Sequence, residues 1–174
     1  MLIFTYISFS LSFQLAEILK NEFDNELEIS LVDFNSKIPF LKQVEIIHNT
    51  DIFLGIHGSG LTHLLFLPEW AALFEIYNCD DPNCYSDLSR LRGIKYFTWP
   101  KYLVNEGIKP YFPSGSPPKD VPHKKFTNYI IDEELFKIEF NKVKEYVRRH
   151  PSFVNEQRKL RRAANIKKNL TKEL

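Results

Sequence analysis

A glycine-rich segment that follows a buried type of strand is the residue pattern in this sequence best suited to chemistry. Its small residues would let backbone N–H groups come close to a phosphate, and a helix that starts there would favour negative charge. His57 could also donate a hydrogen bond to a phosphate or to an oxyanion that develops during a reaction. The alternative is a tight strand-to-helix turn with no ligand, and the segment lacks both the dinucleotide-binding and the P-loop patterns. The candidate phosphate-binding residues are His57, Gly58, Ser59, Gly60, Leu61 and Thr62.

A carboxylate inside an apolar strand is the second candidate. Glu75 lies in the run 72–77, where burial would be costly unless the charge is paired or lies at the edge of a site. At the carboxyl end of a strand it could accept hydrogen bonds from two sugar hydroxyls; otherwise it faces solvent on an edge strand. A couple between His57 and Asp51 is excluded, because the two flank opposite ends of one strand and lie about 15–20 Å apart.

Two cysteines, Cys79 and Cys84, occur in a polar segment. A zinc site would need two more ligands at a useful spacing, and the sequence offers none. The two thiols are therefore either free or paired locally. His63 is expected to form hydrogen bonds on a helix rather than to bind a metal, so no metal site is predicted.

Alternating strands and helices must position these residues. The apolar periodicity predicts an α/β fold, a Rossmann-like parallel sheet with helices on both faces, which binds ligands beyond the carboxyl ends of its strands. Residues 100–130 are expected to form a loop, either a flexible excursion or a lid with a role in acceptor binding. The expected strands are 1–13, 27–34, 51–56, 72–77 and 95–99, and the expected helices are 13–23, 39–49, 61–67, 82–92 and 132–149.

The bulk composition suits one globular domain. The chain has 174 residues, 44% of them hydrophobic, and we assign residues 1–150 to the domain and 151–174 to a basic C-terminal tail. With 23 basic against 22 acidic residues, nucleic acid is not expected as the main partner. The tail is interpreted as solvated, with a membrane-surface or nucleic-acid patch as the alternative. Residues 1–13 are shorter than a membrane span and lack the features of a signal peptide, so no transmembrane segment is expected.

Three nearby segments, residues 48–68, 70–79 and 84–93, form a distinctive sequence. They resemble glycosyltransferase family 61, a family of inverting GT-B enzymes that includes plant xylosyl- and arabinosyltransferases and an O-mannosyl-glycan N-acetylglucosaminyltransferase. The resemblance is close over residues 44–99 and is strongest to members that act on EGF-like domains. It is looser from residues 125–129 to the C-terminal helix.

This resemblance implies the C-terminal, nucleotide-sugar-binding half of a GT-B glycosyltransferase. The donor would be UDP-N-acetylglucosamine (UDP-GlcNAc), the acceptor a Ser or Thr of an EGF-like domain, and neither a metal nor another cofactor would be required. The turn at residues 57–62 would hold the diphosphate and Glu75 the ribose. His57 is a possible catalytic residue, and the base is unknown. The alternatives are a related transferase with another UDP-sugar or an O-mannosyl acceptor, and an inactive UDP-sugar-binding module.

The resemblance also implies the lumen of the endoplasmic reticulum as the compartment. The last four residues, 171–174, are similar to a KDEL-type retrieval signal, and Asn169 opens an N-glycosylation sequon. In that compartment Cys79 and Cys84 would pair as a disulfide. The first 13 residues depart from the family, with no basic residue before Lys20. We therefore expect a fragment that lacks the N-terminal half and that does not catalyse transfer alone.

Overall fold

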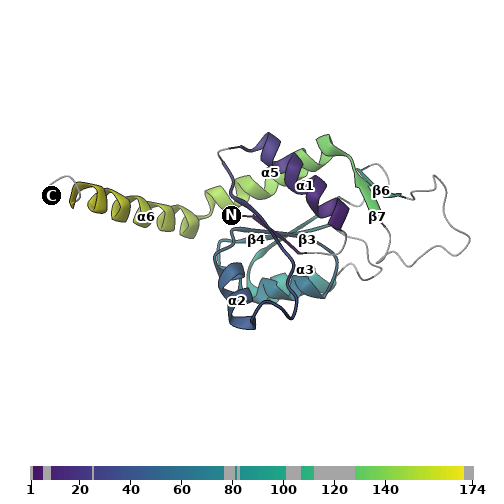
Figure 1. The fold of residues 1–174 in the computed structure, drawn as a ribbon, viewed down its shortest axis with the longest axis horizontal. Coiled ribbons are helices and arrows are strands. Elements are labelled where there is room, and N and C mark those ends of the chain that lie inside the picture. Colours follow the sequence, from purple (N-terminus) through teal and green to yellow (C-terminus); the bar gives the residue numbers. More distant parts are fainter. Residues whose placement is uncertain are drawn as a thin grey trace, which may run out of the picture.

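The computed structural model describes residues 2–5, 9–24, 26–76, 81, 83–100, 107–111 and 128–170 (Figure 1). Five strands form one sheet in the order β2-β1-β3-β4-β5, and every neighbouring pair is parallel. The expected parallel α/β sheet is thus confirmed. Because the chain moves outward from β1 to β2 and then returns past β1 to β3, the strand order reverses between β1 and β3. The strands are β1 (Leu2–Thr5), β2 (Ile29–Val32), β3 (Ile52–Ile56), β4 (Ala72–Ile76) and β5 (Lys95–Thr98).

Helices cover both faces of this sheet, with α1 and α5 on one side and α2 and α3 on the other (Figure 1). Side chains alternate between two buried clusters along each central strand: Ile52 and Leu54 join the cluster under α1 and α5, while Phe53 joins the one under α2, η1 and α3. Burial on both faces explains why these strands read as continuous apolar runs. The helices are α1 (Phe9–Glu22), α2 (Phe40–His48), the 3₁₀ helix η1 (Ser59–Phe66), α3 (Cys84–Arg92), α5 (Glu133–Arg149) and α6 (Pro151–Leu170).

Two helix ends follow the sequence signals closely. Asp132 caps α5, and its side chain accepts a hydrogen bond of 2.9 Å from the Leu135 amide. Gly93 ends α3 in the left-handed region, with φ of 82°, a conformation that a residue with a Cβ rarely adopts. Both predicted boundaries are confirmed.

The expectation of one strand over residues 1–13 is wrong. Strand β1 ends at Thr5, and α1 already begins at Phe9, four residues earlier than the expected helix start at Phe13. The cause is burial: Leu11, Leu15 and Leu19 recur at helical spacing and are all at most 1% exposed. In a continuous apolar run, periodicity alone does not separate a strand from a buried helix.

Two further segments differ from the sequence-based expectations. Within the expected loop 100–130, Ile108–Tyr111 forms strand β6, which pairs antiparallel with β7 (Asn128–Ile131). Ile108 and Ile131 lie in the core cluster under α1 and α5, which explains why this pair is ordered against the domain. Residues 151–170, expected as a tail, form helix α6, which extends away from the sheet (Figure 1).

A charged cluster joins α5 to the segment that follows α1. The buried Lys144 lies over the ring of Phe23, and its ammonium donates to Glu26 at 2.9 Å. Arg148 donates to the same carboxylate, also at 2.9 Å. The hydrogen bond and charge of Lys144, followed by the charge of Arg148, hold the pKa of Glu26 below its ordinary value.

Replacement of Glu26 by glutamine should therefore reduce stability in a pH-dependent way. Because the folded-state pKa is depressed, the stabilisation is present above the pKa of the unfolded chain and is lost as pH falls through the folded-state pKa. We expect Glu26→Gln to lower Tm modestly at neutral pH and to match the parent chain in strong acid. Glu28→Gln, an exposed control two residues away, should leave Tm unchanged. A Tm deficit of Glu26→Gln that is the same at every pH would contradict this assignment.

Candidate functional site

The glycine-rich turn lies at the carboxyl edge of the sheet, where β3 ends beside the reversal of strand order. The His57 amide continues the sheet by donating to the Ile76 carbonyl at 3.1 Å. Gly58 then has φ of 167°, an extended backbone that any residue can adopt, and η1 starts at Ser59. The first N–H groups of a helix have no partner within the helix and point outward from its start. The turn therefore presents backbone donors at the position where α/β sheets bind ligands.

Not every residue predicted for phosphate binding is available to a ligand through its side chain. Leu61 is fully buried, and its amide donates to the Gly58 carbonyl at 2.9 Å. The Thr62 hydroxyl donates to the Ser59 carbonyl at 2.7 Å. These two residues stabilise the turn, whereas Gly58, Ser59 and Gly60 supply its outer backbone.

A buried carboxylate connects the turn to two neighbouring strands. Glu75 is 2% exposed; one of its oxygens lies 2.5 Å from His57 Nδ1, and the other accepts the Tyr96 hydroxyl at 2.6 Å. An Nδ1–H donated to the carboxylate fixes the orientation and tautomer of the imidazole, and leaves Nε2 as its second polar atom. The His57 side chain is 17% exposed and lies at the edge of the site. The buried charge thus has the partners that its burial requires.

Strand register brings this group together. Glu75 of β4 is the register partner of Gly55 on β3 and of Thr98 on β5. His57 and Tyr96 are each two residues from those partners, so all three side chains project from the same face of the sheet. His57 therefore does pair with a carboxylate, and that carboxylate belongs to Glu75. The sequence had excluded Asp51 as the partner and had not predicted Glu75 in that role.

Tyr85 of α3 supports the turn from the same side. Its hydroxyl donates to the Gly58 carbonyl at 2.5 Å, and its ring meets His57 edge-on with centroids 5.0 Å apart. Sequence reasoning missed both Tyr85 and Tyr96. The only available signal was the position of Tyr96 in an adjacent parallel strand on the face that carries Glu75.

Both oxygens of Glu75 contact protein donors, which favours a role in positioning His57 over direct contact with a sugar. The ribose assignment of Glu75 stays a prediction. The carboxylate side of the arrangement can orient the imidazole and stabilise positive charge that develops on it. The exposed side of the turn can accept an anion.

His63 anchors η1 to α2. Its Nδ1 lies 2.9 Å from the Gly60 carbonyl and its Nε2 lies 2.8 Å from Gln43 Oε1. The ring stacks on Phe34 with centroids 4.3 Å apart. The expectation of a hydrogen-bonded histidine on the helix is confirmed.

The remaining predicted positions are only partly described. Cys84 begins α3, but Cys79 lies outside the described residues, and so does the proposed disulfide between them. Asn169 falls within α6, and residues 171–174 lie outside the described part. Across the described ranges, no group of three or more His, Cys, Asp and Glu residues is arranged to hold a metal ion. None of the described helices is long and apolar enough to span a membrane.

Comparison with known proteins agrees with the resemblance. Residues 13–74 match the family model described as Glycosyltransferase 61. The EGF domain-specific O-linked N-acetylglucosamine transferase of Canis lupus familiaris is 48% identical over 130 residues, which are 73% of this chain and 24% of that protein. The Mus musculus protein of the same name is 50% identical over 129 residues, 72% of this chain and 23% of that protein. The Drosophila melanogaster one is 47% identical over 119 residues, 66% and 21% respectively.

These matches show that the chain is homologous to glycosyltransferases of family 61, with the family model matching over residues 13–74. The relatives that it resembles here are EGF domain-specific O-linked N-acetylglucosamine transferases, in agreement with the sequence resemblance. The chain spans about a quarter of the length of these curated relatives.

Proposed function

We propose that this chain is the nucleotide-sugar-binding part of an inverting GT-B glycosyltransferase that transfers N-acetylglucosamine from UDP-GlcNAc to Ser or Thr of EGF-like domains. The observation that carries the proposal is the turn at residues 57–60, which lies where the strand order reverses and is braced by the buried Glu75. The names of the relatives support the transferred sugar and the acceptor. The N-terminal half of the enzyme would lie outside this chain.

The turn would bind the diphosphate of the donor. Backbone N–H groups of Gly58, Ser59 and Gly60 at the start of η1 would donate to the phosphate oxygens. As an imidazolium, His57 would donate from Nδ1 to Glu75 and from Nε2 to the same diphosphate group. These donors and the helix dipole would neutralise the diphosphate without requiring a metal ion.

In the proposed reaction, the acceptor hydroxyl oxygen attacks the anomeric carbon from the face opposite the diphosphate. The bond from that carbon to the phosphate oxygen breaks, UDP leaves with the electron pair, and the hydroxyl proton passes to a base, so the configuration inverts. Negative charge grows on the diphosphate as the bond breaks. His57 and the turn would stabilise that charge, which is the largest type of contribution to many enzymatic rates. The base is assigned to no residue of this chain.

The proposed compartment is the lumen of the endoplasmic reticulum. The family resemblance and the KDEL-like residues 171–174 support it. A disulfide between Cys79 and Cys84 and glycosylation at Asn169 belong to the same proposal, since both modifications need that oxidising and glycosylating environment.

Calorimetric titration of the full chain with UDP tests this assignment. We expect His57→Ala to weaken UDP binding about tenfold through the loss of a charge-assisted hydrogen bond. Gly58→Ala should weaken it similarly, because a Cβ crowds the approach to the turn. The Gly58 backbone is extended, so its φ does not require glycine, and unchanged circular dichroism and Tm of the variant would show that a loss of affinity reports on the ligand rather than on the fold.

His48→Ala is the matched control, since His48 ends α2 at the opposite edge of the sheet. This variant should bind UDP as the parent chain does. UDP-GlcNAc should compete with UDP for the site, and GDP should compete poorly. A folded parent chain that does not bind UDP, or equal losses in His57→Ala and His48→Ala, would refute the proposed site.

A further inference from the structure

A basic groove lies at the elbow between α5 and α6, at the amino edge of the sheet. His150 ends α5 in an extended conformation, and Pro151 starts α6, because a residue before proline avoids the helical region. Phe153 fixes the start of α6 by packing against Trp70, with ring centroids 6.5 Å apart. The groove is separated from the glycine-rich turn by the length of β3, roughly 15 Å at the usual strand rise.

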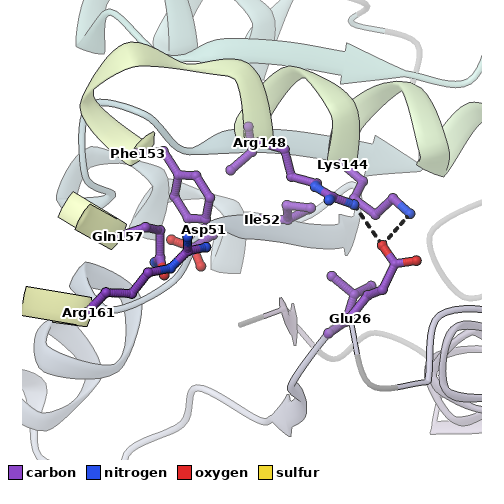
Figure 2. Close-up of a pocket in the computed structure, with 10 residues that line it drawn as sticks. Glu26, Asp51, Ile52, Lys144, Arg148, Phe153, Gln157 and Arg161 are labelled. Carbon is purple, nitrogen blue, oxygen red and sulfur yellow. Dashed lines mark hydrogen bonds and ion pairs between the residues drawn. The ribbon is translucent and has the colours of Figure 1, made fainter. Parts of the chain in front are cut away.

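Two cavities meet at this elbow. The first, about 330 Å³, is bounded by Glu26 and Asp51 on the sheet side and by Lys144, Arg148 and Arg161 on the helices. Figure 2 shows Lys144 and Arg148 both reaching Glu26, whereas Phe153, Gln157 and Arg161 come from α6. In this first cavity, the negative charges of Glu26 and Asp51 offset the positive charges of the basic side chains. The second cavity, about 310 Å³, is lined by Arg148, Phe153, Val154, Gln157, Arg158 and Arg161.

The second cavity is lined by three arginines and by no carboxylate. Arg148 is shared with Glu26 at 2.9 Å and Glu145 at 4.0 Å. Neither Arg158 nor Arg161 lies within 4.0 Å of a carboxylate oxygen among the residues that the structure describes. The guanidinium groups of Arg158 and Arg161 therefore line the second cavity with no carboxylate among its described lining residues.

We propose that this groove binds an acidic peptide segment of a partner protein, in which at least two carboxylates flank an apolar side chain. Guanidinium groups pair with carboxylates through two parallel hydrogen bonds, and Arg158 and Arg161 have that capacity unused. Phe153 and Val154 offer an apolar surface beside them. A membrane surface fits less well, because the arginines line a concave groove that a flat bilayer does not enter.

Fluorescence anisotropy with the full chain tests the proposal. The probe is a short fluorescein-labelled peptide of glutamates interrupted by leucine, and the reference peptide has glutamine at every glutamate position. We expect the double variant Arg158→Glu with Arg161→Glu to weaken binding of the probe about tenfold or more. Added salt should weaken binding to the parent chain.

The matched control is Lys159→Glu with Arg162→Glu, which changes the net charge by the same amount on the same helix. Neither residue lines either cavity, and all four substituted side chains are exposed, so both double variants should keep the helical circular dichroism of the parent. The control should lose about twofold in affinity at most. Equal losses in the two variants, equal binding of the glutamine peptide, or binding to phosphatidylserine vesicles without binding to the peptide would overturn the proposal.

Discussion

Replacing Phe136 by alanine should lower the free energy of unfolding by about 3–5 kcal/mol, the usual cost of truncating a fully buried phenylalanine. Phe136 lies on α5 with no exposed surface, at the centre of an aromatic cluster. Its ring stacks against Phe74 of β4 at 6.1 Å and against Trp99 at 6.5 Å, and it contacts Phe140 at 5.9 Å. Alanine would leave a cavity that these large, rigid rings fill poorly.

Urea unfolding followed by circular dichroism measures this effect, and Phe13→Ala provides the control. Phe13 lies on α1 with 51% of its surface exposed, so the same chemical change should alter stability by about 0.5 kcal/mol or less. A loss below about 1 kcal/mol in Phe136→Ala would mean that α5 does not cover the sheet in the way described. The comparison therefore tests the packing of α5 on the face of the sheet opposite the Glu75 side chain.

The parts of the fold that the sequence predicted are those determined by local pattern. Strand β3 is a short, continuous apolar run, and β4 is one that is interrupted only by Glu75. Asp132 and Gly93 carry cap signals that act within a few residues. Both interpretations of segment 1–13 bury apolar residues, so the sequence pattern does not separate them, and the contacts of α1 with β2, α5 and β7 favour the helix. Pairing of β6 with β7 joins residues about twenty positions apart, which periodicity does not encode.

The candidate site likewise has one part that local sequence predicts and another that depends on contacts between distant residues. The glycine-rich turn was recognisable because its small residues and the following helix are contiguous in sequence. The couple of His57 with Glu75 and the bond from Tyr96 depend on the register of three parallel strands, which is set by packing across the whole sheet. Sequence alone identified Glu75 as an unusual carboxylate but not its partners. The energetic cost of burying a carboxylate thus identified Glu75 as a residue of interest, but it did not predict which residues Glu75 contacts.

Replacing Glu75 by leucine should destabilise the chain by about 3–5 kcal/mol, because it removes the buried carboxylate that accepts from two partly buried donors. The affected donors are the imidazole of His57 and the hydroxyl of Tyr96. Glu75→Gln is the informative companion. Its carbonyl oxygen can still accept from His57, and its amide can donate to the Tyr96 oxygen once that hydroxyl rotates. We expect it to cost only about 1–2 kcal/mol.

Because Glu75→Gln keeps the fold, it separates the two roles considered for this carboxylate. If Glu75 bound the ribose, the parent chain would prefer UDP over 2′-deoxy-UDP, and the glutamine variant would lose part of that preference. If Glu75 positions His57, the variant should bind both nucleotides more weakly by the same factor, since the imidazole loses the charge that supports its donor function. We expect the second result from titration calorimetry. A change in the ratio of the two affinities would instead assign Glu75 to the sugar and would require the carboxylate to turn away from His57 or Tyr96 when the nucleotide binds.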